Sequence, residues 1–138
     1  MDDYITNIID QYEEELQKVK NYGWALTFVK EQTPELCLKA VQKNRWALRY
    51  VNEQTPEICL AAVKQNGYAL EFVIEQTPEL CLEAVKNDGY ALYFVNEQTP
   101  ELCLAAVQQN GWALQFVTER KLKEKIRLEL NLLVIQIK

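Results

Sequence analysis

The sequence predicts an all-α protein, an α-solenoid of 22-residue repeats with two short helices in each repeat. Three observations carry this prediction. An aromatic-Ala-Leu triplet recurs every 22 residues from Trp24 to Trp112 without an insertion. Each repeat holds two apolar segments with helical spacing, and a Thr-Pro-Glu tripeptide separates them in four repeats. A fixed period of this kind is typical of arrays in which each unit packs only on its neighbours.

We predict a single helical-repeat domain over residues 1–138. It begins with an N-terminal cap and continues with four full repeats, a half repeat and a C-terminal cap. In chain order these parts are 1–22, then 23–44, 45–66, 67–88 and 89–110, then 111–121, and finally 122–138. Helices are expected at 3–20, 24–31, 34–43, 46–53, 56–65, 68–75, 78–87, 90–97, 100–109 and 112–119.

The N-terminal cap is predicted from apolar residues that run from Ile5 to Val19 along one face of a helix over 3–20. In the repeat frame Glu14 and Glu15 replace a Leu-Cys pair. An end cap needs such polar residues because its outer face meets water. Six acidic residues precede the first lysine. They favour a solubilising cap, and the alternative is an acidic docking surface.

Each repeat is expected to form two helices. At about 100° per residue, the apolar side chains of segments such as 46–51 and 58–63 cover one broad arc of a helix. The second helix is expected to begin at Thr-Pro-Glu. Thr can cap the helix, and Pro suits its first position because the missing N–H would be unpaired there anyway. The Glu carboxylate is stabilised by the positive end of the helix dipole.

The joints between repeats carry Asn44, Asn66, Asp88 and Asn110. The next residue is Gly in three joints and Arg45 in one, which argues against a strict need for a positive φ. We therefore expect each Asn or Asp to cap the first helix of the following repeat.

The C-terminal cap departs from the repeat pattern. The helical spacing of Leu122, Ile126 and Leu130 predicts a helix that closes the array, whereas alternating apolar residues after Ile126 leave a strand open. Five basic residues lie within 120–127, opposite in charge to the acidic start of the chain. Head-to-tail association of copies is one hypothesis from this asymmetry. The apolar run 132–135 is expected to pack on the array or on another copy, so self-association through this segment is a further expectation.

The composition argues against catalysis. The chain has a net charge of −5 and contains neither His nor Ser, which excludes a Ser-His-acid triad and zinc sites that need His. We expect no enzymatic activity, no cofactor and no metal. The net negative charge disfavours direct nucleic-acid binding. The apolar runs are too short for a membrane span, and the acidic start of the sequence does not resemble a secretory signal.

Four cysteines occupy one position of the repeat. Stacked helices place such residues about 8–10 Å apart, farther than a disulfide or a shared metal allows. We expect buried small packing residues and therefore a cytoplasmic, reducing location. The aromatic columns are expected in the core, with base stacking as the alternative.

A Glu recurs at the end of each first helix, and a Gln follows it in four of the five cases, for example Gln54 after Glu53. A carboxylate opposes the helix dipole there. Each Glu, or the Gln beside it, is therefore expected to bond backbone N–H groups at a neighbouring helix start. The alternative is a column of carboxylates that holds a cation or a basic peptide.

The candidate partner-binding residues occupy two repeat positions that vary within an otherwise fixed unit. They are Thr27, Arg49, Glu71, Tyr93 and Gln115, with Lys30, Asn52, Ile74, Asn96 and Thr118 beside them. The predicted function is a non-enzymatic protein–protein interaction module, although drift at exposed positions would produce the same variation. The alternative is a small acidic inhibitor of phage or viral anti-defence type that blocks a nucleic-acid-binding host enzyme.

The segments NGYALEFV (66–73) and TPELCLAAV (99–107) resemble the tandem repeats catalogued as domain of unknown function 4116, which occur in bacterial, protist and large-virus proteins. The resemblance covers 23–119. Arg45 in place of Gly and the loss of Thr-Pro-Glu after Glu119 depart from the pattern. The resemblance implies a helical array and no assigned activity, cofactor or catalytic residue.

Overall fold

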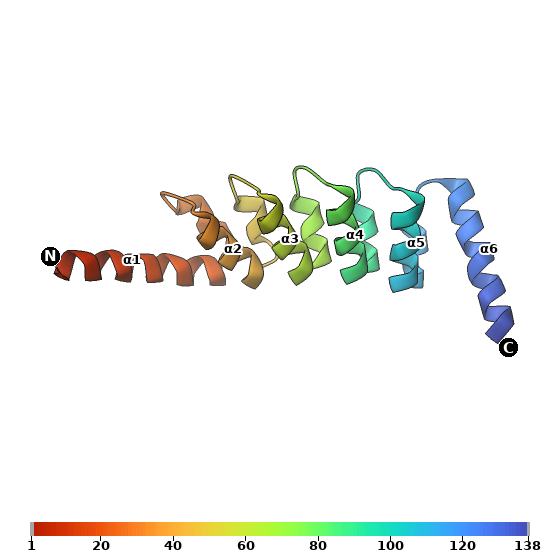
Figure 1. Ribbon diagram of the computed structural model, residues 1–138, viewed down its shortest axis with the longest axis horizontal. Coiled ribbons are helices and arrows are strands. Elements are labelled where there is room, and N and C mark those ends of the chain that lie inside the picture. Colours follow the sequence, from red (N-terminus) through yellow and green to blue (C-terminus); the bar gives the residue numbers. More distant parts are fainter. Residues whose placement is uncertain (1, 138) are drawn as a thin grey trace.

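The computed structural model describes the backbone of residues 2–137 and the side chains of residues 2–131. Helices follow one another in a single elongated row (Figure 1), and the described residues contain no strand. The predicted all-α solenoid is thereby confirmed. The α-helices are α1 (Asp2–Asn21), α2 (Pro34–Lys43), α3 (Pro56–Gln65), α4 (Pro78–Asn87), α5 (Pro100–Gln109) and α6 (Arg120–Ile137). Short 3₁₀ helices alternate with them, namely η1 (Gly23–Phe28), η2 (Ala47–Tyr50), η3 (Gly67–Phe72), η4 (Gly89–Phe94) and η5 (Gly111–Phe116).

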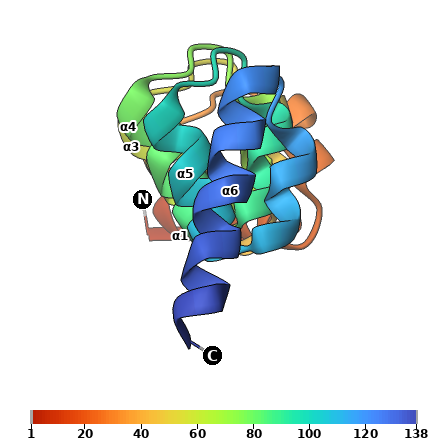
Figure 2. The same cartoon turned by 90° about the vertical axis from the view of Figure 1, so that its right-hand side faces the viewer.

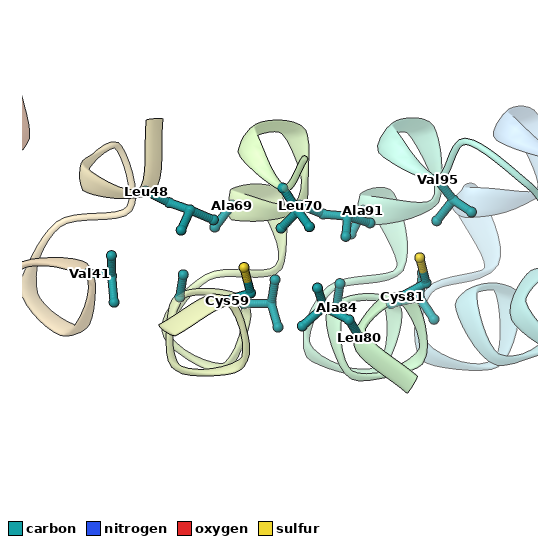
Figure 3. Close-up of a cluster of buried hydrophobic side chains, with 14 of the residues drawn as sticks. Val41, Leu48, Cys59, Ala69, Leu70, Leu80, Cys81, Ala84, Ala91 and Val95 are labelled. Atoms are coloured by element: carbon teal, nitrogen blue, oxygen red, sulfur yellow. The ribbon is translucent and has the colours of Figure 1, made fainter. Parts of the chain in front are cut away.

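The core lies between two layers, one of α-helices and one of 3₁₀ helices. In Figure 3, Leu48 and Leu70 come from the 3₁₀ layer and face Cys59 and Cys81 of the α layer. Both leucines are fully buried, and each has an equivalent in the repeats around it. Each repeat thus buries its two apolar arcs against each other and against its neighbours, as the period predicts.

The second helix of each repeat begins as predicted. The Thr77 hydroxyl accepts a hydrogen bond from the Leu80 N–H at 3.2 Å, and Pro78 is the first helical residue. The same cap forms at Thr33, Thr55 and Thr99. A polar side chain that satisfies one orphan N–H stabilises a helix by about 1 kcal/mol, so the four tripeptides set the start of α2 to α5.

The first helix of each repeat differs from the prediction. It is a 3₁₀ helix that ends three residues earlier than predicted, as in η3, where Ala69 N–H donates to Asn66 O at 2.9 Å. The physical reason lies just beyond Phe72. The Phe72 carbonyl and the Ile74 N–H are both bound by the Gln54 side chain, so they cannot extend the helix.

The joints are capped as predicted. The Asn66 side-chain oxygen accepts from the Tyr68 N–H at 2.9 Å, and Asn66 has extended backbone angles. No glycine among the described residues has a positive φ. Gly67 is needed for a different reason, because a Cβ there would lie 2.5 Å from the Ala84 carbonyl oxygen. Where Arg45 replaces Gly, the 3₁₀ helix is shortened to Ala47–Tyr50.

The aromatic columns lie at the edge of the core rather than inside it, so the expectation that they are core residues is wrong for the exposed rings, while six others pack against the core. Trp24, Trp46, Trp112 and Phe28 are exposed, and most of the other rings are half-buried. A 3₁₀ helix has three residues per turn, so Trp46 stands above the exposed Arg49 while Ala47 and Leu48 point inward. The rings instead form pairs between successive repeats.

The two terminal helices differ in how they attach to the array. In α1, Tyr12, Leu16 and Val19 pack on the core, and the first half of the helix projects beyond the repeats (Figure 1). At the other end α6 is helical, so the strand alternative is wrong. Its start is capped by Glu119, whose carboxylate accepts from the Lys121 N–H at 3.0 Å. The side chains of 132–135 lie outside the described residues.

A candidate protein-binding groove

A ladder of glutamine side chains holds the loops that follow the 3₁₀ helices. Gln54 Nε2 donates to the Leu48 carbonyl at 3.2 Å and to the Phe72 carbonyl at 2.8 Å, and Gln54 Oε1 accepts from the Ile74 N–H at 3.0 Å. Gln32, Gln76 and Gln98 make the equivalent contacts. The prediction that each Glu, or the Gln beside it, bonds backbone N–H groups at a neighbouring helix start is confirmed at Glu119, which caps α6. It is wrong for the four ladder glutamines, which bond an N–H beyond the end of the next 3₁₀ helix.

This fixed loop borders a groove of about 820 Å³ between α3 and α4. Its apolar wall includes Cys59, Leu60, Leu80 and Leu82. Its polar wall includes Lys64 from α3, Glu79 and Glu83 from α4, and Glu75 from the loop. Gln54, Pro56, Ile74 and Thr77 complete the lining.

Two residues make this groove different from the equivalent places in neighbouring repeats. Ile74 is 74% exposed, whereas the same repeat position holds Asn52 and Asn96 on either side. Glu83 occupies the position of Ala61 and Ala105. An isolated exposed Ile would be unremarkable, but this side chain continues an apolar wall, and apolar patches of that kind mark interaction sites.

The electrostatics of the groove favour a cationic ligand. Three carboxylates line it against one ammonium group, Lys64. The ion pairs that the structure shows between described residues, Lys39–Glu35 and Arg127–Glu124, lie elsewhere. Glu79 and Glu83 are spaced i,i+4 on α4, where like charges destabilise a helix slightly. Burial raises the pKa of the Cys59 thiol, so this part of the apolar wall carries no charge at neutral pH.

The ten residues predicted from repeat variability are all exposed, as expected. They do not converge on one site. Of the ten, Ile74 lines the groove, whereas Glu71 borders a separate hollow of about 180 Å³ with Arg45 and Trp46. Tyr93 packs its ring against Phe94 and Phe116, with centroids 5.1 and 5.4 Å apart.

The sequence prediction missed the α3 and α4 residues of the groove. Leu60, Leu82 and Glu79 gave no signal because the same residue types recur at those positions in other repeats. Glu83 did carry a signal, since its repeat position holds Lys39, Ala61 and Ala105 elsewhere. That position lies on the second helix, whereas the prediction considered variation on the first helix.

The four cysteines are packing residues of the core. All four cysteines are buried and free, each on its own helix, as predicted. Figure 3 shows the sulfurs of Cys59 and Cys81 directed toward the 3₁₀ layer, and each Sγ lies 3.5 to 3.7 Å from the Oε1 of the ladder glutamine in its own repeat. The acidic residues behind the inhibitor hypothesis lie on α1, mostly exposed, and that hypothesis stays a prediction.

No helix among the described residues combines the length and apolar character that a membrane crossing requires.

Comparison with known proteins agrees with the repeat architecture. Neither the curated proteins nor the solved structures include a match to the chain. A family model, described as "Domain of unknown function (DUF4116)", matches twice in tandem, at residues 33–76 and 77–123. The first match begins at the helix cap Thr33 and the second at the helix cap Thr77, so each covers two structural repeats. Because these matches span more than half of the sequence, the chain belongs to the DUF4116 family.

Proposed function

We propose that this protein is a non-enzymatic interaction scaffold that binds a basic amphipathic segment of a partner protein in the groove between α3 and α4. The observation that carries the proposal is Ile74, an exposed apolar side chain beside an apolar wall and three carboxylates. A volume of about 820 Å³ is in the range of protein ligand sites.

The groove suits a helix or an extended peptide with one apolar anchor. The anchor would contact Ile74, Leu60 and Leu82, in the manner of an amphipathic helix that places its apolar face in a groove. Lys or Arg side chains of the partner would reach Glu79 and Glu83. Charge complementarity of this kind accelerates association and selects among partners more than it adds affinity.

Further features support binding rather than catalysis. The sequence has neither His nor Ser, and burial raises the pKa of all four thiols, so a reactive thiolate is disfavoured. The acidic wall disfavours direct binding of a phosphate backbone. Four free cysteines suit a reducing compartment, so we place the interaction in the cytoplasm.

The test uses affinity capture from the native host with the intact chain, followed by titration of the captured protein after its purification. The groove variant Ile74→Asn with Glu83→Ala installs the residues of the neighbouring repeats. The matched control is Asn96→Ala with Glu101→Ala, one repeat further along the same side of the array. Urea unfolding of both variants checks that the fold is unchanged.

We expect the groove variant to bind at least about ten-fold more weakly, which corresponds to about 1.4 kcal/mol, and the control to bind normally. Higher salt should weaken the binding because exposed charges are screened. Undiminished binding by the groove variant would exclude this site. If binding were lost instead in an Arg49→Ala, Glu71→Ala, Tyr93→Ala variant, the partner would occupy the 3₁₀ face.

A further inference from the structure

The apolar stripe of α1 continues past the end of the array. Its second half, at Tyr12, Leu16 and Val19, packs on the core. On the same helical face Ile5 and Ile9 are 54% and 51% exposed, because the first turns of α1 project beyond the repeats (Figure 1). Tyr4 and Ile8 are exposed beside them. A short helix in water is marginal without tertiary contacts, so this segment gains stability when its stripe is covered.

The surface of the first repeat is also open. Between α1 and η1 lies a hollow of about 480 Å³, whose lining includes Trp24 and Phe28. Phe72, Phe94 and Phe116 each pair with a ring of the preceding repeat, with centroids 5.4 to 5.8 Å apart. Phe28 is 78% exposed, because its upstream position in the repeat frame is Asp2 on α1. At this end Phe28 therefore lacks the ring of a preceding repeat that Phe72, Phe94 and Phe116 have.

The C-terminal end of the array also exposes large apolar side chains. Trp112 is 77% exposed, whereas Trp46, Tyr68 and Tyr90 each contact a Phe of the next repeat. On α6, which crosses this end of the array (Figure 2), Leu128 is exposed. Both are large apolar side chains at the opposite end from the α1 stripe.

The two ends have opposite charge. On α1, Asp2, Asp3, Asp10, Glu13 and Glu14 are exposed, and the first basic residue of the chain is Lys18. On α6, Arg120, Lys121, Lys125 and Arg127 are exposed, and Arg127 is paired with Glu124. Like-charge repulsion disfavours the pairing of two α1 helices, whereas an acidic apolar helix complements a basic apolar end.

We propose that the N-terminal end of one copy docks on the C-terminal end of a second copy, so that the protein assembles head to tail. The head is Tyr4, Ile5, Ile8, Ile9 and Phe28, and the tail is Trp112, Leu128, Lys121 and Lys125. The contact is heterologous, so it leaves one head and one tail free for further copies. The groove between α3 and α4 lies in the middle of the array, so an assembly would present several grooves and bind a multivalent partner with higher avidity.

Two full-length variants separate this arrangement from other modes of association. Ile5→Glu with Ile9→Glu blocks the head, and Trp112→Glu with Leu128→Glu blocks the tail. All four positions are exposed, so the fold should tolerate the changes, and circular dichroism and urea unfolding check it. Ile74→Glu is the matched control, since it places the same charge at an exposed Ile in the middle of the array. Sedimentation velocity measures the mass at several protein and salt concentrations.

The wild-type chain and the Ile74→Glu control should form species that grow with protein concentration and shrink with salt. Each blocked variant alone should be monomeric, with a dissociation constant raised at least about ten-fold. An equimolar mixture of the two should form a one-to-one dimer and nothing larger, because one free head meets one free tail.

Three results would overturn the proposal. One is a wild-type chain that stays monomeric at its highest soluble concentration in low salt. Another is a tail-blocked variant that still dimerises alone, which would indicate α1 pairing with α1. The third is loss of assembly in Ile74→Glu, which would assign the contact to the groove. The experiment requires no binding partner, so either of the first two results leaves the proposed function intact, whereas the third would assign the groove to self-association.

Discussion

Substitution of a ladder glutamine tests how the repeats are joined. Gln76 belongs to the repeat 67–88 and bonds the next repeat, through Nε2 to the Phe94 carbonyl at 2.8 Å and through Oε1 to the Asn96 N–H at 2.9 Å. A third contact, to the Leu70 carbonyl, is long at 3.4 Å. Gln76→Met keeps the approximate volume of the side chain and removes these three hydrogen bonds, together with the weak one that Oε1 accepts from the Cys81 thiol at 3.5 Å.

The expected cost follows from these contacts. Each well-formed hydrogen bond contributes about 0.5–1.5 kcal/mol net, and a partly buried carbonyl left without a donor costs about 1 kcal/mol or more. Two good bonds and one long bond predict a loss of about 2–3 kcal/mol in the free energy of unfolding. Gln65→Met is the control, because Gln65 is exposed and the change there should stay within about 0.5 kcal/mol.

Urea unfolding followed by circular dichroism measures both variants against the wild-type chain. In a solenoid the stability is carried by interfaces between neighbours, so the Gln76 change should also broaden the transition by weakening one interface. Equal unfolding midpoints for Gln76→Met and Gln65→Met would refute the proposed role of the ladder.

Gln76→Glu tests the donor role through pH. A carboxylate would face the Phe94 and Leu70 carbonyl oxygens, whereas a protonated acid could still donate one hydrogen bond. The pKa of the introduced acid should therefore be raised in the folded state above its unfolded value of about 4.3. Its stabilising effect should be complete below pH 4.3 and disappear as the pH rises through the folded pKa. The difference in stability from Gln76→Met should accordingly change with pH.

Two further predictions concern close packing and the thiols. Gly67→Ala should lower the free energy of unfolding by about 1–3 kcal/mol, because its Cβ would meet the Ala84 carbonyl oxygen. Gly111→Ala is the control and should not lower it, because nothing lies within 4 Å of a Cβ there. Equal urea midpoints for the two variants would contradict the packing argument. Burial raises the pKa of the four cysteine thiols above their ordinary 9.0, so unfolded thiols ionise first and stability should decline as the pH rises above 9.0. Thiol labelling should be slow in the native protein and fast after unfolding, and equal rates would indicate that the thiols are accessible.

Features that depend on neighbours within a few residues could be predicted from the sequence. Thr77 bonds the N–H three residues later, and Asn66 bonds the N–H two residues later. Such contacts form whenever the local backbone turns, so the residue type and its spacing suffice. Burial of the cysteines was predictable as well, because an exact period gives every copy the same surroundings.

Features that depend on the neighbouring repeat could not be predicted in the same way. The Gln54 side chain reaches partners 18 and 20 residues further along the chain. These contacts hold the backbone just beyond η2 to η5. The first helix is a 3₁₀ helix in every repeat, including η1, and this geometry turns the tryptophans outward. A helical wheel at 100° per residue therefore assigned Trp24, Trp46 and Trp112 to the wrong side.

Part of the candidate groove could be predicted from the sequence, and part required the structure. Ile74 was found because one position varies within a fixed unit, and variation is visible in a single sequence. Its place in one groove with Leu60 of α3 and with Glu83 of α4 required the structure. The ladder contact that fixes the backbone at Ile74 came only from the structure.

The sequence by itself determined the repeat, its boundaries, its helix caps and its buried small residues, because periodicity and capping are local properties of the chain. The tertiary structure decided where the first helix of each repeat ends, which rings face water, how α1 projects from the array and which side chains share a groove. These depend on the spacing between stacked repeats, which is set when glycine backbones, glutamine side chains and apolar arcs pack together.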